Sequence, residues 1–290
     1  MTHDTCVRNV TRLRDGALVL KGDSMTQATY THGHHESVLR SHRWRTVENS
    51  AAYLLPYLSG GTTVLDVGCG PGTITADIAR IVAPGAVIGV DAASGVIATA
   101  QADSTPAGLN VAYRVDDAYA LAAADGSVDI VHAHQVLQHL ADPVAALCEW
   151  RRVCVSGGVV AARDADYSAF HWYPADPRLD RWLELYCLAA RANAGEPDAG
   201  RHLLAWAHAA GFTDVTATAS VWCFANPAGR EYWGGMWADR ILKSALTDQL
   251  IRDGLSTPDE LRGISDAFRA WTAHPDGWFL VPHGEIICRA

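Results

Sequence analysis

The sequence predicts an α/β fold with a seven-stranded, mostly parallel sheet, helices on both faces and additional helical segments that form a lid. Short apolar stretches typical of buried strands alternate with stretches of helical periodicity through the first half of the chain. The 290 residues are 49% apolar, which is enough to bury one large core. Such alternation is typical of a parallel sheet that is covered on both sides.

The elements of the first half follow from apolar spacing and from residues that begin or end helices. Asp142 and Pro143 suit the start of a helix, and Gly157 with Gly158 suits its end. The expected elements are helix 37–58, strand 62–67, helix 73–82, strand 86–91, helix 94–103, strand 109–115, strand 128–133, helix 143–153 and strand 158–164.

Beyond residue 165 the pattern becomes aromatic and helical. Two helices and two strands are expected at 180–194, 201–210, 215–224 and 278–288, with about two helices between the strands. Thr257, Pro258 and Glu260 mark the start of the second of these helices, since they combine a capping box with a first-turn proline. We therefore divide the chain into an N-terminal arm or lid (1–36), a core (37–165), and a segment (166–290) with lid helices and the last two strands.

The stretch 64–73 has the pattern of a buried strand, a glycine turn and the start of a helix. A glycine turn after the first parallel strand lets a ligand lie against bare backbone, where a Cβ would collide with it. Gly72 comes one residue earlier than the third glycine of dinucleotide-binding turns, and Asp66 lies two residues before Gly68. A carboxylate there would repel a pyrophosphate but favours the cationic end of S-adenosylmethionine (SAM). We expect a SAM site, rather than a nicotinamide or flavin dinucleotide site or an empty turn, at Asp66, Gly68, Gly70 and Gly72.

The next apolar stretch ends in an acid, Asp91, where folds of this kind hydrogen-bond both ribose hydroxyls of a ligand. The alternative is that Asp91 caps the following helix. Ser94 already supplies an N-cap candidate for that helix, so we favour ligand binding by Asp91, with Ala92 beside it.

Composition excludes several classes of partner. The formal net charge is −9 with no long basic run, which argues against a nucleic-acid substrate. No apolar run approaches the ~20 residues of a membrane span. Seven scattered cysteines without a Cys-x-x-Cys pair suit a reducing compartment. We expect a cytoplasmic protein without nucleic-acid or membrane partners, and the sequence leaves open whether it forms a homodimer.

With the glycine turn, Asp91, the segment 116–118 and the segment 125–129 in this order, the chain resembles the class I SAM-dependent methyltransferases of the ubiquinone/menaquinone-biosynthesis C-methyltransferase type. The resemblance covers roughly residues 37–165 and implies a Rossmann-like fold, SAM as cofactor and a small-molecule methyl acceptor. It also implies that an acid after the third strand holds the adenine amino group. In this sequence that acid is Asp117, and Ala118 lies beside it. Asp116 is the alternative if the alignment shifts by one residue. His134 and Gln135, after the fourth strand, would line the methionine end of the ligand.

Methyl transfer is an in-line displacement, so the protein mainly positions the nucleophile and excludes water. A base is needed only for acceptors such as phenols, alcohols and acidic carbons. Some O-methyltransferases that resemble this chain use a histidine where His139 stands, and an acid where Asp164 or Asp166 stands. We expect His139 and Asp164 to be catalytic, although His139 could instead cap or pack beneath the ligand.

Aromatic residues are concentrated in the segments that should cover the pocket, and flat apolar walls suit an apolar or aromatic acceptor. Each tryptophan taken singly could instead pack in the hydrophobic core and have no contact with the acceptor. The expected acceptor-pocket residues are His139, Trp172, Tyr173, Trp222, Trp233 and Trp237.

Tyr30 is expected to fold over the cofactor together with the histidine-rich segment that follows it. The spacing of the histidines between residues 32 and 42 matches no closed metal site, so no bound metal is expected.

The sequence therefore predicts an enzyme that moves the methyl group of SAM to a small, apolar or aromatic acceptor and releases S-adenosylhomocysteine. One alternative is an enzyme on the same fold that retains SAM without transferring its methyl group, such as a cyclase. A less favoured alternative is a dinucleotide-dependent oxidoreductase.

Overall fold

The computed structural model describes residues 11–12, 18–19, 44–104 and 107–290. Strands β1 (Thr11–Arg12) and β2 (Leu18–Val19) form a separate antiparallel pair. The rest of the arm expected at 1–36, including Tyr30, lies outside the described residues.

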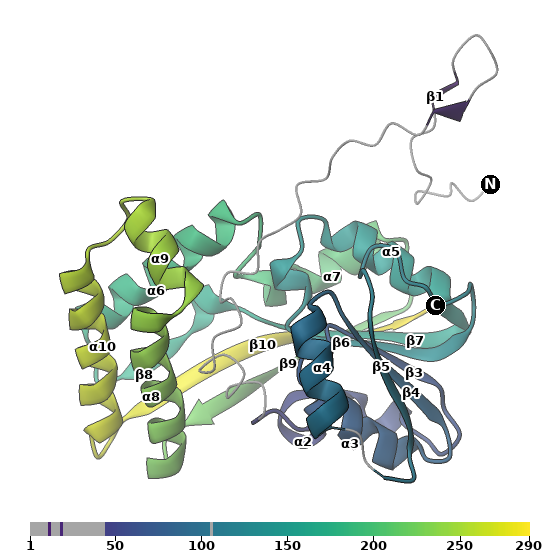
Figure 1. Ribbon diagram of the computed structural model, residues 1–290, viewed down its shortest axis with the longest axis horizontal. Coiled ribbons are helices and arrows are strands. Elements are labelled where there is room, and N and C mark those ends of the chain that lie inside the picture. Colours follow the sequence, from purple (N-terminus) through teal and green to yellow (C-terminus); the bar gives the residue numbers. More distant parts are fainter. Residues whose placement is uncertain (1–10, 13–17, 20–43, 105–106) are drawn as a thin grey trace.

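One large sheet runs through the remaining described chain (Figure 1). Its strands are β3 (Val64–Val67), β4 (Ala86–Asp91), β5 (Asn110–Val115), β6 (Val128–His134), β7 (Cys154–Ala165), β8 (His171–Tyr173), β9 (Val215–Phe224) and β10 (Trp278–Arg289). The order is β5-β4-β3-β6-β7-β10-β8, and β9 pairs with the other edge of β10. The strands β3 to β7 pair in parallel, whereas β10 is antiparallel to its three partners. The predicted fold class is confirmed.

The prediction of seven strands is wrong, because this sheet has eight in the described chain. The additional strand is β8, three residues long. Residues 283–289 of β10 pair with β7, and residues 278–280 pair with β8. Thus β8 continues the line of β7 along β10 after a 3₁₀ turn, η3 (Tyr167–Ala169). Three residues are too few to show an alternating pattern in the sequence, so only the pairing with β10 identifies this strand.

The helices cover both sides of the sheet and extend beyond it. They are α2 (Val47–Ser50), α3 (Thr73–Val82), α4 (Ser94–Asp103), α5 (Pro143–Val153), α6 (Pro177–Ala192), α7 (Ala199–Ala209), α8 (Pro227–Lys243), α9 (Ala245–Arg252) and α10 (Pro258–Ala273), with 3₁₀ turns η1 (Ala52–Tyr57) and η2 (Leu137–His139). Among these helices, none is both long enough and apolar enough to span a lipid bilayer.

Two stretches differ from the expected helices. In the described part of the range 37–58, α2 is followed by η1, because Ala51 leaves helical geometry and Pro56 lacks the N–H that a continuing α-helix needs. Between β9 and β10 there are three helices instead of about two. Ser244 has extended backbone and separates α8 from α9.

Both faces of the parallel part of the sheet are covered by helices, and successive side chains of each strand pack against opposite layers. Val64 and Ile130 pack with α2, η1 and α3, whereas the next residues, Leu65 and Val131, pack with α5 and α7. Successive strand residues point to opposite faces, so burial on both sides produces the continuous apolar stretches seen in the sequence.

A third apolar cluster surrounds the first half of β10. It joins α6, α8, α9 and α10, and its tryptophans and phenylalanines make edge contacts. The ring centroid of Trp182 lies 4.5 Å from that of Trp237 and 5.0 Å from that of Phe268. Figure 1 shows these helices together on the left, apart from α3, α4 and α5, with β10 running between the two groups. The strand β10 is therefore shared by the core and the helical group.

A buried ion pair connects the three strands on this side of the sheet. Arg163 Nε on β7 lies 3.2 Å from Glu285 Oε1 on β10, and the hydroxyl of Thr218 on β9 donates to Glu285 Oε2 at 2.8 Å. The two charged side chains are 1% and 6% exposed, so water screens their interaction little. Burial lowers the pKa of Arg163 to about 10, because desolvation disfavours the charged form.

Replacing Glu285 with Gln is expected to lower the free energy of unfolding by about 3 to 5 kcal/mol, because it leaves the guanidinium of Arg163 buried without its counter-charge. Urea denaturation followed by circular dichroism measures the change. As a control, Arg262→Gln removes an exposed pair with Asp259 on α10. It should change stability by no more than about 0.5 kcal/mol. Equal stability of the two variants would contradict the role of the buried pair.

Candidate functional site

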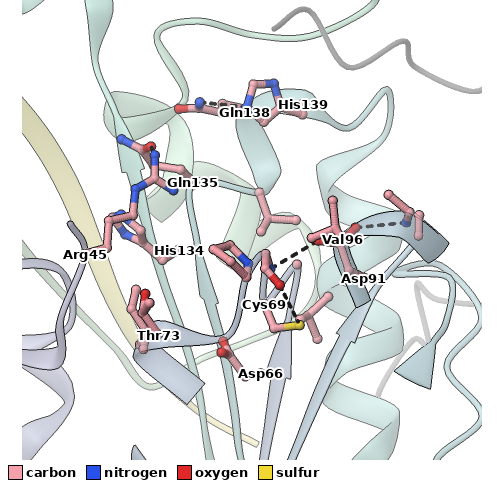
Figure 2. A pocket seen from close by; sticks show the side chains of 18 of the residues that line it. Arg45, Asp66, Cys69, Thr73, Asp91, Val96, His134, Gln135, Gln138 and His139 are labelled. Atoms are coloured by element: carbon pink, nitrogen blue, oxygen red, sulfur yellow. Dashed lines mark hydrogen bonds between the residues drawn. The ribbon is translucent and has the colours of Figure 1, made fainter. Parts of the chain in front are cut away.

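A cavity of about 360 Å³ lies at the carboxyl ends of β3, β4 and β6 (Figure 2). One side is formed by the glycine turn after β3 and by the loops after β4 and β5. The other side is formed by the end of β6, by η2 and η3, and by residues of β9 and α8. Open α/β sheets bind ligands at this edge, and the volume suits small molecules.

The glycine turn presents bare backbone to the cavity at Gly68 and Gly70, whereas Gly72 lies outside the lining. Gly68, Gly70 and Gly72 have φ values of 67°, 56° and 82°, in the left-handed region that other residues rarely adopt. A Cβ on Gly68 would collide with Cγ2 of Val136, and a Cβ on Gly72 would lie 2.7 Å from the hydroxyl of Tyr113. The turn therefore requires glycine for its conformation and for its close packing.

Asp91 holds the glycine turn against the end of β4. Its Oδ2 accepts a hydrogen bond from the Gly70 N–H at 3.2 Å, and its Oδ1 accepts one from the Ala93 N–H at 2.9 Å. Figure 2 shows the side chain at the cavity beside Val96, and Ala92 also lines this part of the cavity. A carboxylate has about four acceptor positions, so it can hold backbone groups and still accept from ligand hydroxyls.

Asp66 lies beneath the same turn and is 3% exposed. Its Oδ1 lies 2.8 Å from Nδ1 of His132, and its Oδ2 accepts from the Thr75 hydroxyl at 2.5 Å. These contacts connect β3 to β6 and to α3. The negative charge of Asp66 favours a cation in the cavity, although both oxygens have protein partners.

The three residues 116–118, which follow β5, do not all face the cavity. Asp116 and Ala118 line the cavity, whereas Asp117 is exposed and lies outside the lining. The Asp116 carboxylate accepts from the Ala122 N–H at 3.1 Å, and Asp117 Oδ1 accepts from the Tyr119 N–H at 2.9 Å. Which of the two acids contacts adenine stays a prediction.

Gln135 lies on the opposite side of the cavity, next to Arg45 (Figure 2). Its Oε1 accepts from Arg45, and its Nε2 lies 2.9 Å from Nε2 of His283. Nδ1 of His283 lies 2.9 Å from the carbonyl oxygen of Val281, so Nδ1 carries the hydrogen and Nε2 accepts. This tautomer fixes the amide of Gln135, with its NH₂ toward His283 and its oxygen toward Arg45.

His134 lines the cavity at the end of β6 and is 5% exposed. Neither ring nitrogen has a hydrogen-bond partner within the described chain. The ring centroid lies 5.6 Å from that of Trp222 and 6.0 Å from that of His283. Burial and the positive charges of Arg45 and Arg163 hold the pKa of His134 well below its usual value, so the imidazole is neutral at neutral pH.

His139, the expected base, lies on η2 and also lines the cavity. Its Nε2 lies 3.0 Å from Nε2 of Gln138, an amide donor. Burial and the charge of Arg45 lower the pKa of His139 to about 3. At neutral pH this histidine is therefore neutral, and its Nε2 accepts from a protein group.

Asp164 lies outside the cavity lining and is fully buried on β7. Its Oδ1 accepts from the Gln138 N–H at 3.1 Å, and burial raises its pKa to about 7. Asp164 thus holds the turn η2, which carries Gln138 and His139. The other candidate acid, Asp166, is bound by Arg201 on α7, whose Nε donates to it at 2.7 Å.

The expected aromatic residues divide into two groups. Trp222, Trp233 and Trp237 line the cavity. Trp172 and Tyr173 lie on β8 outside the lining. Trp172 stacks on Phe279 with centroids 5.4 Å apart, and Tyr173 is 56% exposed.

Several lining residues were missed by the sequence analysis. These are Arg45, Gln138, Tyr167, Phe170, Tyr232, Met236, Arg240 and Val281. For the residues of α8, the sequence did contain a signal. Tyr232 and Met236 are four residues apart and lie on the same face of the helix as each other. The same holds for the predicted pair Trp233 and Trp237. Arg45 has no such signal, because only the tertiary fold brings it to Gln135. Tyr30 and the histidines between residues 32 and 42 lie outside the described residues.

Comparisons with known proteins agree with this geometry. Residues 65–162 match a family described as methyltransferase domain. An uncharacterised methyltransferase of Schizosaccharomyces pombe is 33% identical over 272 residues, covering 90% of this chain and 96% of the relative. The probable methyltransferase ltbC of Aspergillus luteorubrus is 29% identical over 280 residues, covering 89% of this chain and 96% of the relative. The crystal structure of the YcgJ protein of Bacillus subtilis shares the fold, with a TM-score of 0.54 and 20% identity over 83% of this chain and 98% of that chain.

Replacing Asp91 with Ala is expected to weaken SAM binding about 10- to 100-fold, because a charge-assisted hydrogen bond to the ligand is lost together with the contacts to the turn. Isothermal titration calorimetry measures the affinity. Asp266→Ala removes the same charge from an exposed position on α10 and should leave the affinity within about twofold of the original. Unchanged affinity in the Asp91 variant would refute the assignment of this residue.

Proposed function

The chain belongs to the class I SAM-dependent methyltransferases, and from this premise we propose that it transfers the methyl group of SAM to a small aromatic acceptor. S-adenosylhomocysteine would be the second product. The observation that carries the acceptor class is the aromatic wall of the cavity, opposite the glycine turn.

The residues on the glycine-turn side fit SAM. Gly68 and Gly70 offer backbone that a ligand can approach closely, and Asp91 is placed to accept hydrogen bonds. SAM supplies a methyl carbon that its sulfonium has activated toward nucleophiles. The carboxylates of Asp66 and Asp91 lie on this side of the cavity, and their charge suits a cationic ligand.

The opposite side supports a flat, apolar acceptor. Phe170, Trp222, Trp233 and Trp237 are each no more than 6% exposed and line this part of the cavity. Aromatic side chains favour stacked or edge contacts with other aromatic rings. Their burial also keeps water from the reacting atoms, so the chain itself supplies positioning and water exclusion.

The size and charge of the site support a small molecule over a polymer. The cavity has a volume of about 360 Å³, and α8 and η3 contribute to its wall. The net charge of −9 disfavours a polyanionic substrate such as RNA or DNA. His139 stays a candidate for contact with the acceptor, and Asp164 a candidate for holding the turn beneath it.

The proposal is tested first by calorimetric titration with SAM and S-adenosylhomocysteine, with NADH as the control ligand. We expect binding of the first two ligands and none of NADH, because the carboxylate of Asp66 before the glycine turn disfavours a pyrophosphate. A panel of small phenols, amines and acidic carbon compounds is then screened by mass spectrometry for a methylated product.

Formation of S-adenosylhomocysteine in proportion to a methylated aromatic product would support the function. Binding of SAM with conversion of an acceptor but without S-adenosylhomocysteine would instead support an enzyme that retains SAM. Methylation restricted to non-aromatic compounds would contradict the acceptor class that we propose.

A further inference from the structure

We propose that β9 forms the interface of a homodimer, in which the outer edge of this strand pairs antiparallel with the same edge of a second copy of the chain. The two-fold axis passes beside Thr218, and the two sheets join into one continuous sheet. This inference concerns assembly and does not depend on the methyl acceptor proposed above.

The strand β9 lies at the rim of the sheet. One of its edges pairs with β10 along ten residue pairs, and no strand of the described chain pairs with its other edge (Figure 1). Residues 216–219 are exposed, and Val221 is 54% exposed. A long edge strand with accessible backbone groups is a template for pairing with another chain.

The pairing with β10 determines which backbone groups of β9 point outward. The N–H of Arg289 donates to the carbonyl oxygen of Asp214, so the odd-numbered residues of β10 direct their backbone groups toward β9. Their partners are the even-numbered residues of β9, such as Thr218 opposite Glu285. The N–H and C=O groups of the odd-numbered residues therefore point away from β10. These residues are Val215, Ala217, Ala219 and Val221.

The edge of β9 lacks the features by which proteins commonly prevent pairing between chains. Charged residues, proline and bulges are the usual protection. The strand Val215–Phe224 contains neither a charged residue nor proline, and its register with β10 is continuous. At the opposite end of the sheet, β5 is six residues long, contains Arg114 and is followed by two acids. The β5 edge is therefore protected, whereas the β9 edge is suited to a partner.

The sequence of β9 is suited to pairing with itself. Residues 215–221 read VTATASV, which is the same in both directions except that Ser220 replaces a threonine. An antiparallel pair centred on Thr218 places valine opposite valine, alanine opposite alanine and hydroxyl opposite hydroxyl. Such β-branched pairs and Thr or Ser pairs stabilise neighbouring strands. A two-fold interface must be self-complementary, so this symmetry favours a second copy over an unrelated strand.

The outward backbone groups agree with the same register. Ala217 lies opposite Ala219 of the second copy, and the backbone groups of both residues point outward, so the pair can exchange two N–H···O=C bonds. Val215 and Val221 form an equivalent pair. Thr218 lies opposite its own copy in a pair without hydrogen bonds, as required by a residue whose backbone groups are directed toward β10.

The charge of the chain is compatible with this interface. A formal net charge of −9 makes copies of the chain repel each other, so a contact between identical surfaces requires a region without opposed acids. The acid nearest to the strand is Asp214, which lies opposite Trp222 of the second copy in this register. No pair of like charges therefore meets along the paired strands.

Association is tested by size-exclusion chromatography with light scattering on the full-length chain over about 1 to 100 µM. We expect the mass to rise toward twice the chain mass of 31.1 kDa as the concentration increases. Ala219→Lys places a charge on the outer edge and should weaken association about tenfold or more. Ala270→Lys makes the same change at an exposed position on α10 and should keep the dimer.

The register is tested with Thr218→Cys in a chain whose exposed Cys223 is replaced with Ser. Opposed residues in a pair without hydrogen bonds have Cα atoms about 4.5 Å apart, within the range that a disulfide spans. We expect mild oxidation to link two copies through position 218, measured by non-reducing electrophoresis. Val221→Cys in the same background is the control, because its two copies lie six positions apart, or about 20 Å, and should not be linked.

The outcomes distinguish the interface from its register. A monomer at every concentration, or a dimer that persists unchanged in Ala219→Lys, would overturn the interface. Loss of the dimer in Ala219→Lys without cross-linking at position 218 would overturn the register centred on Thr218. Thermal unfolding followed by circular dichroism shows whether each variant has folded. Binding of S-adenosylhomocysteine by a chain that stays monomeric would overturn the dimer and leave the proposed function in place.

Discussion

The antiparallel pairing of β10 with β7 and β9 fixes the two sides of the cavity relative to each other. One edge of β10 is bonded to β7, which belongs to the parallel core, and the other edge is bonded to β9 along ten residue pairs. This pairing places Trp222 and His283 together, with ring centroids 4.4 Å apart, beside the end of β6. The buried pair of Arg163 and Glu285 crosses the same strands. The aromatic wall therefore has a defined position only because the sheet continues into the second half of the chain.

The cavity separates opposite charges. Among its described lining residues, the carboxylates of Asp66, Asp91 and Asp116 follow or belong to β3, β4 and β5, whereas Arg45 and Arg240 lie on the side of the aromatic wall. Under the proposed function, a methyl donor that carries a positive charge and an acceptor that loses a proton would make opposite demands on their surroundings. A fixed arrangement of protein charges would meet both demands without reorganisation during such a reaction.

Local patterns predicted those parts of the fold that local interactions determine. The helix 143–153 was predicted with its observed bounds, because Asp142 caps it through the Ala145 N–H and Pro143 begins it. The glycine turn and Asp91 could also be located, since the glycine spacing and the acid at the end of an apolar stretch are visible in the sequence itself. The strand β8 and the contact of Gln135 with His283 could not, because pairing between distant segments creates them. The unpartnered state of His134 likewise follows from tertiary packing and has no signal in the sequence.

The burial of Asp164 beneath η2 makes the stability of the fold depend on pH close to neutrality. The folded protein raises the pKa of this carboxyl to about 7, whereas an unfolded chain leaves it near 3.9. Between these values the folded state binds the proton more strongly, so the contribution of Asp164 to stability is fully present in acid and is lost as the pH rises through about 7. The turn that carries Gln138 and His139 thus rests on a group that ionises close to neutral pH, and a modest alkaline shift places a new charge directly behind the cavity wall.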